Sequence, residues 1–147
     1  MDEIHNPDIR RIREIPYLRE SLEALERRRD WARGRCERIT RQFSPVSGGG
    51  GGARRPMDDM AAELEELDRR YQLLMKSYLR QLRHAERLLA GIESLQLRTF
   101  ITLAYLEDRK GPDIQKRMNM SRWVYENSRR ICEEADSIGE IKWHDRR

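Results

Sequence analysis

Apolar side chains recur at alternating steps of three and four residues along two long stretches of the chain. The first stretch runs from Leu18 to Phe43 and the second from Met57 to Ile92. This spacing puts the apolar side chains on one face of a helix and leaves charged residues on the other faces. The pattern therefore predicts two long, coiled-coil-like helices. We expect the first to begin at Pro16, because proline suits the first turn of a helix.

A glycine-rich segment separates the two predicted helices. Residues 48–52 are five consecutive glycines, and Pro45 and Pro56 flank them. Glycine has high backbone freedom and no side chain to bury, so residues 44–56 are expected to form a flexible loop. A phosphate-binding loop would instead follow a strand and end in Gly-Lys-Ser/Thr. The simplest arrangement is an antiparallel helical hairpin over residues 16–93, closed by this loop.

The pattern changes after Gly91, where residues 94–135 predict three shorter helices. Apolar residues of 100–104 support one helix that ends near Glu107. Gly111-Pro112 suits the start of a second helix, and Asn119-Met120 suits a tight turn after it. Ser121 is a good N-cap for the third helix, on which Val124, Ser128, Ile131 and Ala135 share one face. Helix, short turn and helix in this order predict a helix-turn-helix.

Local charge supports a nucleic-acid partner for this region. Seven basic residues and only two acidic ones lie between Arg109 and Arg130. A recognition helix turns its apolar face to its own domain and its N-terminal turns to base edges. The candidate base-reading residues are Arg122, Trp123, Glu126, Asn127 and Arg130, and Ser121 opens their helix. The candidate phosphate contacts are Lys110, Lys116, Arg117 and Arg129. The alternative is a three-helix piece of a bundle with a solvated basic face.

Specific residues of this region also resemble a known family. Tyr105-Leu106-Glu107, Asp113-Ile114 ahead of Lys116-Arg117-Met118, and Ser121 with Val124-Tyr125 are similar to the helix-turn-helix of sigma-70 region 4. The layout resembles the small phage and prophage proteins of the RinA and ArpU type. The resemblance implies late-gene transcriptional activation, with host RNA polymerase as a candidate partner beside double-stranded DNA. The chain departs from the pattern at Asn127 and Ser128, where a large aliphatic residue is expected, and at bulky Trp123.

The rest of the sequence restricts the function further. The chain has 147 residues, 37% hydrophobic and 38% charged, with a net charge of +4. These values suit long two-faced helices better than a large core. Residues 1–15 are expected to be a mobile lead-in, and the tail, 136–147, either to cap the C-terminal domain or to stay loose. Cys36 and Cys132 lack paired spacing, and no segment predicts a signal peptide or membrane span, so a cytoplasmic location is expected. The resemblance to phage proteins implies that the cell is a bacterial host.

No catalytic residues, metal site or cofactor are expected, because the three histidines are scattered and the acidic pairs point apart on their helices. Each hairpin arm must pair within the chain or with another copy, and a homodimer would suit half-sites about 34 Å apart. The all-α reading leaves three functions open. They are a sequence-specific transcriptional regulator, a DNA-packaging protein of the terminase small-subunit class, and a helical adaptor without nucleic acid.

Overall fold

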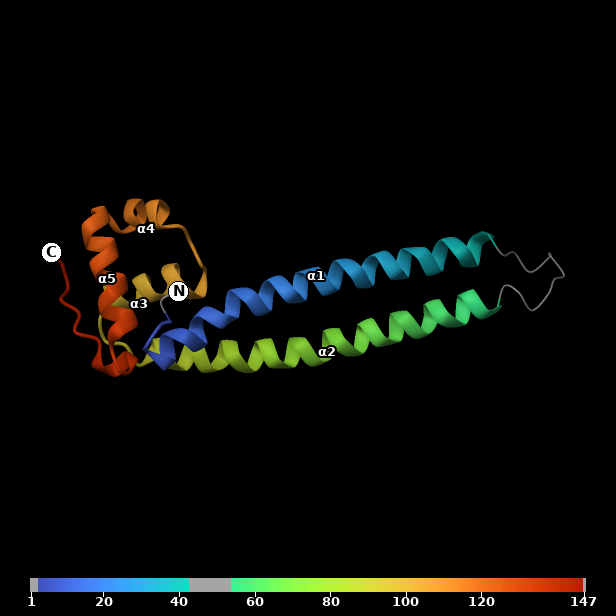
Figure 1. The fold of residues 1–147 in the computed structure, drawn as a ribbon, viewed down its shortest axis with the longest axis horizontal. Coiled ribbons are helices and arrows are strands. Elements are labelled where there is room, and N and C mark those ends of the chain that lie inside the picture. The colour runs from blue at the N-terminus through green and yellow to red at the C-terminus, as the bar shows by residue number, and fades with distance from the viewer. Residues whose placement is uncertain (1–2, 43–53, 147) are drawn as a thin grey trace. The chain divides into compact units, whose positions relative to one another are not determined.

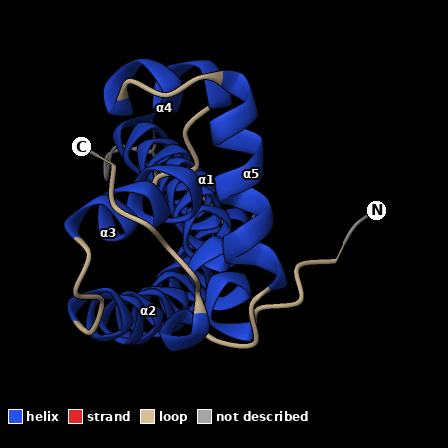
Figure 2. Ribbon diagram, turned by 90° about the vertical axis from the view of Figure 1, so that its left-hand side faces the viewer, coloured by secondary structure: helices blue, strands red, loops and turns tan. Residues whose placement is uncertain are grey.

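The computed structural model describes residues 3–42 and 54–146, and within these ranges it contains helices and loops but no strand (Figures 1 and 2). The all-α prediction is therefore confirmed. None of the helices in the described ranges is long and apolar enough to span a bilayer. The elements in order are α1 (Pro7–Gln42), α2 (Arg54–Ala90), α3 (Leu95–Ile101) with a π-helical continuation (Thr102–Leu106), α4 (Gly111–Met118), α5 (Arg122–Glu134) and a 3-10 turn (Ile138–Glu140).

The chain divides into two compact units. Unit 1 comprises Met1–Leu18 and Tyr78–Arg147, and unit 2 comprises Arg19–Ser77. Unit 1 thus combines the first turns of α1 and the last turns of α2 with the shorter helices. The predicted glycine-rich loop lies outside the described residues for 44–53, whereas Arg54–Pro56, which the prediction gave to the loop, belong to α2.

The expectation of a mobile lead-in over residues 1–15 is wrong for the residues described there. Helix α1 begins at Pro7, and Pro16 lies inside it. Ile4, Ile9, Ile12 and Ile15 are buried in the core of unit 1. The isoleucines of the helix stand three residues apart, so they form one apolar face, and burying each contributes about 1.5–3 kcal/mol. This burial holds the segment in place.

Asn6 fixes the start of α1 and joins it to the end of α5. Its side chain is fully buried, and its Oδ1 accepts a hydrogen bond from the backbone N–H of Asp8 at 3.0 Å, as an N-cap does. Its Nδ2 donates to the carbonyl of Cys132 at 3.0 Å, and its backbone N–H donates to the carbonyl of Glu133 at 2.9 Å. These carbonyls belong to the last turn of α5, where no partner within the helix is available. Asn6 therefore supplies hydrogen-bond partners both to the first turn of α1 and to the last turn of α5.

Phe100 lies at the centre of the unit 1 core. It is fully buried on α3 and contacts the rings of Tyr105, Tyr125 and Trp143 at centroid distances of 6.4, 6.1 and 5.6 Å. After α3 the helix widens to a π-turn, closed by the hydrogen bond from Glu107 N–H to the Thr102 carbonyl at 2.8 Å. The widening shifts the helical phase. As a result, three consecutive residues, 103–105, are all buried.

The tail packs onto unit 1, which settles the choice that the sequence left open. Ile138 is buried, and Trp143 packs against the core. The backbone of Arg146 exchanges two hydrogen bonds with the side chain of Gln96, at 2.6 and 2.8 Å. Ser94, the N-cap of α3, also donates to Asp145. The tail thus crosses the start of α3. It is held by these polar contacts after Trp143 and, before it, by the hydrogen bond that the backbone N–H of Ile138 donates to Asp8 at 3.0 Å.

Unit 2 consists of parts of α1 and α2 that pack on each other. Leu22 and Ala32 of α1 and Met60 and Leu67 of α2 are its buried apolar residues. Arg29, which interrupts the apolar seam, has a side chain only 16% exposed. Its guanidinium lies 4.1 Å from the centroid of the Tyr71 ring, and its Nε lies 3.6 Å from Asp68. The cation–π contact and the ion pair offset part of the cost of placing a charge on the seam, and Nε itself makes no hydrogen bond among the described residues.

Candidate nucleic-acid interface

Helix α4 begins and ends at the residues that the sequence predicted. Lys110 precedes its first turn in an extended conformation, and Pro112 occupies that turn. Gly111 leaves room for the neighbouring helix, because a Cβ built on it would lie only 2.9 Å from the Tyr125 ring of α5. Asn119 ends the helix in the left-handed conformation at φ 51°, which asparagine adopts more readily than most residues.

Three residues then connect α4 to α5, and the second helix is capped as expected. The Ser121 hydroxyl accepts a hydrogen bond from Val124 N–H at 3.2 Å. Ser121 is exposed and lies at the N-terminal end of α5. This end carries the partial positive charge of the helix dipole, which favours anions. The predicted break and N-cap between Met118 and Arg122 are confirmed.

The buried face of α5 agrees with the predicted one at Ser128 but is turned toward Tyr125 and Cys132. Ser128 is buried as expected, Tyr125 and Cys132 are buried with it, and Val124 and Ile131 are only half-buried. Tyr125 contacts Phe100, and the carbonyl of Cys132 accepts the hydrogen bond from Asn6. Burial raises the pKa of the Cys132 thiol to about 12. The face that meets the core is set by these contacts, not by the aliphatic residues of the helix.

The rotation turns Arg129, a predicted phosphate contact, toward its own domain. Its guanidinium donates to the Tyr125 hydroxyl at 3.1 Å and to Glu133 at 3.4 Å, and lies 5.6 Å from the centroid of the Tyr105 ring. Burial by itself lowers the pKa of Arg129, but the hydrogen bond to Tyr125 and the charges of Tyr105 and Glu133 outweigh this effect and raise it. Its contacts with Tyr125, Glu133 and the neutral Tyr105 ring therefore engage Arg129 in holding α5 and the core together.

The opposite face of α5 carries the remaining candidates. The side chain of Arg122 is 84% exposed and Trp123 is 70% exposed. Arg122 Nε donates to Glu126 at 3.0 Å, one turn further along the helix. Arg130 is exposed and donates to the side-chain oxygen of Asn127 at 2.6 Å. Asn127 is half-buried, so its amide is less accessible than the three charged side chains.

Helix α4 adds cations beside this face. Lys110 and Lys116 are exposed, and Arg117 donates to Asp113 at 3.2 Å. The hydrogen bond from Arg117 holds the pKa of Asp113 below its ordinary value. Arg117 and Arg146 of the tail line one groove, and no acidic side chain lines it. No pattern in the sequence located Arg146. The signal that could have located it is the apolar spacing of Ile138, Ile141 and Trp143, because these residues hold the tail on the core.

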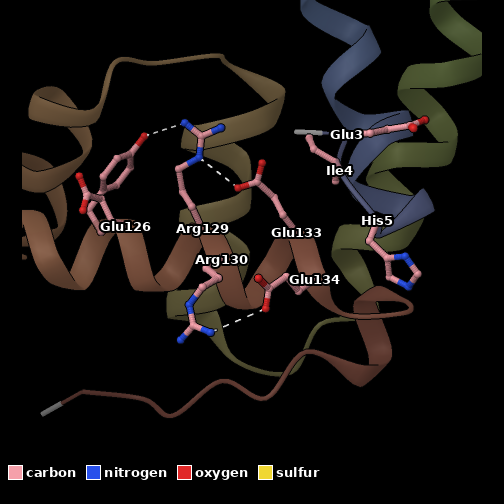
Figure 3. Close-up of a pocket in the computed structure, with 9 residues that line it drawn as sticks. Glu3, Ile4, His5, Glu126, Arg129, Arg130, Glu133 and Glu134 are labelled. Atoms are coloured by element: carbon pink, nitrogen blue, oxygen red, sulfur yellow. Dashed lines mark hydrogen bonds and ion pairs between the residues drawn. The ribbon is translucent and has the colours of Figure 1, made fainter. Parts of the chain in front are cut away.

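A second groove, between the N-terminal segment and the C-terminal turns of α5, has the opposite character. Glu3, Glu126, Glu133 and Glu134 line it together with two arginines and His5. Figure 3 shows Arg129 and Arg130 on opposite sides of α5, each near a glutamate. Four carboxylates around two guanidiniums disfavour a phosphate ligand. This groove is therefore a poorer phosphate site than the surface formed by α4, the first turns of α5 and the end of the tail.

The described ranges contain no group of three or more His, Cys, Asp or Glu residues that could hold a metal ion. No family of known proteins, no curated protein and no solved structure matches this chain.

Proposed function

We propose that this chain is a sequence-specific, double-stranded DNA-binding protein that regulates transcription. In this proposal α4 and α5 form a helix-turn-helix, and α5 is the recognition helix. The long helices α1 and α2 form an antiparallel hairpin that carries the DNA-binding unit. The resemblance to sigma-70 region 4 adds that the regulation concerns phage or prophage late genes and that host RNA polymerase is a partner.

The observation that carries the proposal is the orientation of α5. One face is anchored in the core by Tyr125, Ser128 and Cys132. The N-terminal turn leaves Arg122 and Trp123 at 84% and 70% exposure. A recognition helix needs this combination, because it enters the major groove with its N-terminal turns while the opposite face stays on the domain. Arg122 and Glu126 must exchange their mutual ion pair for base contacts, Arg122 to guanine and Glu126 to the amino group of cytosine.

The cations of α4 complete the surface. Lys110, Lys116 and Arg117 are exposed, and lysine or arginine contacts to phosphates supply affinity without sequence information. Each phosphate contact also makes binding sensitive to salt. Arg117 must exchange its pairing with Asp113 for a phosphate, whereas Lys110 and Lys116 have no ion pair among the described residues. The two lysines are therefore the stronger candidates for backbone contacts.

The test is fluorescence anisotropy with a randomised duplex and with the duplex selected from it by repeated binding and amplification. We expect binding at low salt that weakens as salt is raised. Lys116→Ala should weaken binding to both duplexes about equally and reduce the salt slope by about one unit. Arg122→Ala should weaken the selected duplex by about 1–3 kcal/mol and the random duplex much less.

The matched control is Arg83→Ala, which removes an exposed arginine of α2 and should change neither affinity. Absence of salt-sensitive binding would refute the proposal and favour a helical adaptor. Binding to a DNA-packaging site without an effect on transcription would favour the terminase class. Equal loss on both duplexes for Arg122→Ala would remove Arg122 from the base-reading set.

A further inference from the structure

Unit 2 has a strong segregation of charge that the proposed function does not use. From Arg27 to Arg41, α1 carries seven arginines and only two acidic residues. From Met57 to Asp68, α2 carries six acidic residues and no basic one. The two helices of the same unit therefore present surfaces of opposite sign.

Part of this charge is satisfied within the unit. Asp68 pairs with Arg29 and Arg33, and Glu66 pairs with Arg69 and Arg70. The rest has no ion pair among the described residues. On α1 we call Arg27, Arg28, Arg35 and Arg38, with Trp31 at their centre, the arginine stripe. On α2 we call Asp58, Asp59, Glu63 and Glu65, which are all exposed and spread over about 160° of the helix surface, the acidic stripe.

Exposed apolar side chains accompany this unpaired charge. Trp31 is 59% exposed, and the guanidinium of Arg35 lies 4.6 Å from the centroid of its ring. Leu73 on α2 is 62% exposed. Large apolar side chains within a charged surface are typical of protein interfaces, where tryptophan and arginine contribute most of the binding energy. The stripes are thus suited to a protein partner.

We infer that unit 2 binds a second copy of this chain, with the arginine stripe of each copy on the acidic stripe of the other. In a twofold-symmetric dimer one contact occurs twice, so both stripes of both copies are neutralised together. The stripes have comparable lengths, about 16 Å and about 10 Å at 1.5 Å per residue. A nucleic acid would neutralise the arginine stripe alone and would be repelled by the acidic one. The second copy is the occupant that satisfies both.

The test uses the full chain without DNA, so its outcome does not depend on the proposed function. Sedimentation velocity over a range of concentrations should show a monomer–dimer equilibrium. Its dissociation constant should rise on the order of tenfold or more between about 50 mM and about 500 mM salt, because exposed charges are screened. A single monomeric species at all concentrations at low salt overturns the inference.

Two charge-reversal variants define the contact. One carries Arg27→Glu, Arg28→Glu and Arg35→Glu, and the other carries Asp59→Lys, Glu63→Lys and Glu65→Lys. Each variant alone should be monomeric, because both of its contacts would join like charges. An equimolar mixture should form a heterodimer with both contacts restored. Far-UV circular dichroism checks that each variant keeps its helical content, and mixing tests the contact even if the variants differ in stability.

The matched control is the triple reversal Arg80→Glu, Arg83→Glu and Arg87→Glu on exposed positions of α2 in unit 1. It changes the net charge as much as the arginine-stripe variant does and should dimerise like the wild type. Dimers that survive both stripe reversals, or variants that fail to associate when mixed, overturn the inference. A monomeric wild type whose arginine-stripe variant loses DNA affinity would assign the stripe to phosphates instead.

Discussion

Replacement of Asn6 by alanine should destabilise unit 1 far more than a loss of one side-chain amide near the N-terminus normally does. Two hydrogen bonds of this fully buried side chain disappear, the N-cap bond from Asp8 and the bond to the Cys132 carbonyl. Loss of an N-cap costs about 0.5–2 kcal/mol. A buried carbonyl left without a partner costs about 1–3 kcal/mol. The expected loss is therefore roughly 2–4 kcal/mol.

The assay is urea unfolding followed by tryptophan fluorescence in a Trp31→Phe background. Trp143 packs against the unit 1 core and then dominates the change, because Trp123 is already 70% exposed in the folded protein. The measured quantity is the free energy of unfolding of unit 1. In a thermal scan the same loss corresponds to a fall of roughly 5–15 °C in Tm.

Two further variants separate the contributions. Asn127→Ala removes a half-buried amide from the exposed side of α5 and should change the free energy of unfolding by no more than about 0.5 kcal/mol. Asn6→Asp keeps an N-cap of equal quality but places an acceptor against the Cys132 carbonyl. It should be at least as damaging as Asn6→Ala. Two results would refute the role of Asn6 as a bridge between α1 and α5. One is an Asn6→Asp variant as stable as the wild type, and the other is an Asn6→Ala variant with the same free energy of unfolding as Asn127→Ala.

Three other predictions follow from the core of unit 1. Tyr105→Phe should be neutral or stabilising, because within the described residues the buried hydroxyl has no hydrogen-bond partner; a loss above about 1 kcal/mol in urea would contradict this. Gly111→Ala should cost about 1–3 kcal/mol in the same assay, because its Cβ would lie 2.9 Å from the Tyr125 ring, and wild-type stability would show that the ring yields freely. A thiol reagent should modify Cys36 but not buried Cys132 in the folded protein, and both in urea. Burial raises the pKa of Cys132 to about 12, so the neutral thiol contributes to the free energy of unfolding. This contribution is complete below the unfolded pKa of about 8.5 and should fall as the pH rises from there toward 12. Rapid modification of the folded Cys36→Ser variant would show that the Cys132 thiol is not protected.

The sequence contained a helix-start signal that the prediction at Pro16 passed over. Asn6-Pro7-Asp8 combines an N-cap residue, a proline in the first turn and an acidic residue near the helix dipole. The same chemistry correctly located the starts of α4 and α5. The apolar residues at 9, 12 and 15 are also at helical spacing, but no single-sequence pattern states which helices they meet. Proline inside α1 removes one hydrogen bond, and the buried isoleucine face outweighs that loss.

The candidate interface shows the same limit on a finer scale. Helix α5 has two possible buried faces that are offset by one residue. One contains Val124 and Ile131, and the other contains Tyr125 and Cys132. Aliphatic character favours the first, whereas aromatic contact with Phe100 and the bond from Asn6 select the second. The observed face turns Arg129 inward, whereas Arg122 and Trp123 stay exposed. Which arginines are available to a ligand is therefore a tertiary property.

The sequence by itself determined that the chain is helical, where α4 begins and ends and where α5 begins, because proline, asparagine and serine act on the backbone within a few residues of their own position. Only the tertiary structure decided which face of α5 is buried, that the N-terminal isoleucines belong to the core, and that the tail lies across α3. These features depend on contacts between residues far apart in the sequence, such as Asn6 and Cys132, 126 positions apart, and Asp8 and Ile138, 130 positions apart. Periodicity states that a helix has an apolar face, but the partner of that face is set by packing in three dimensions.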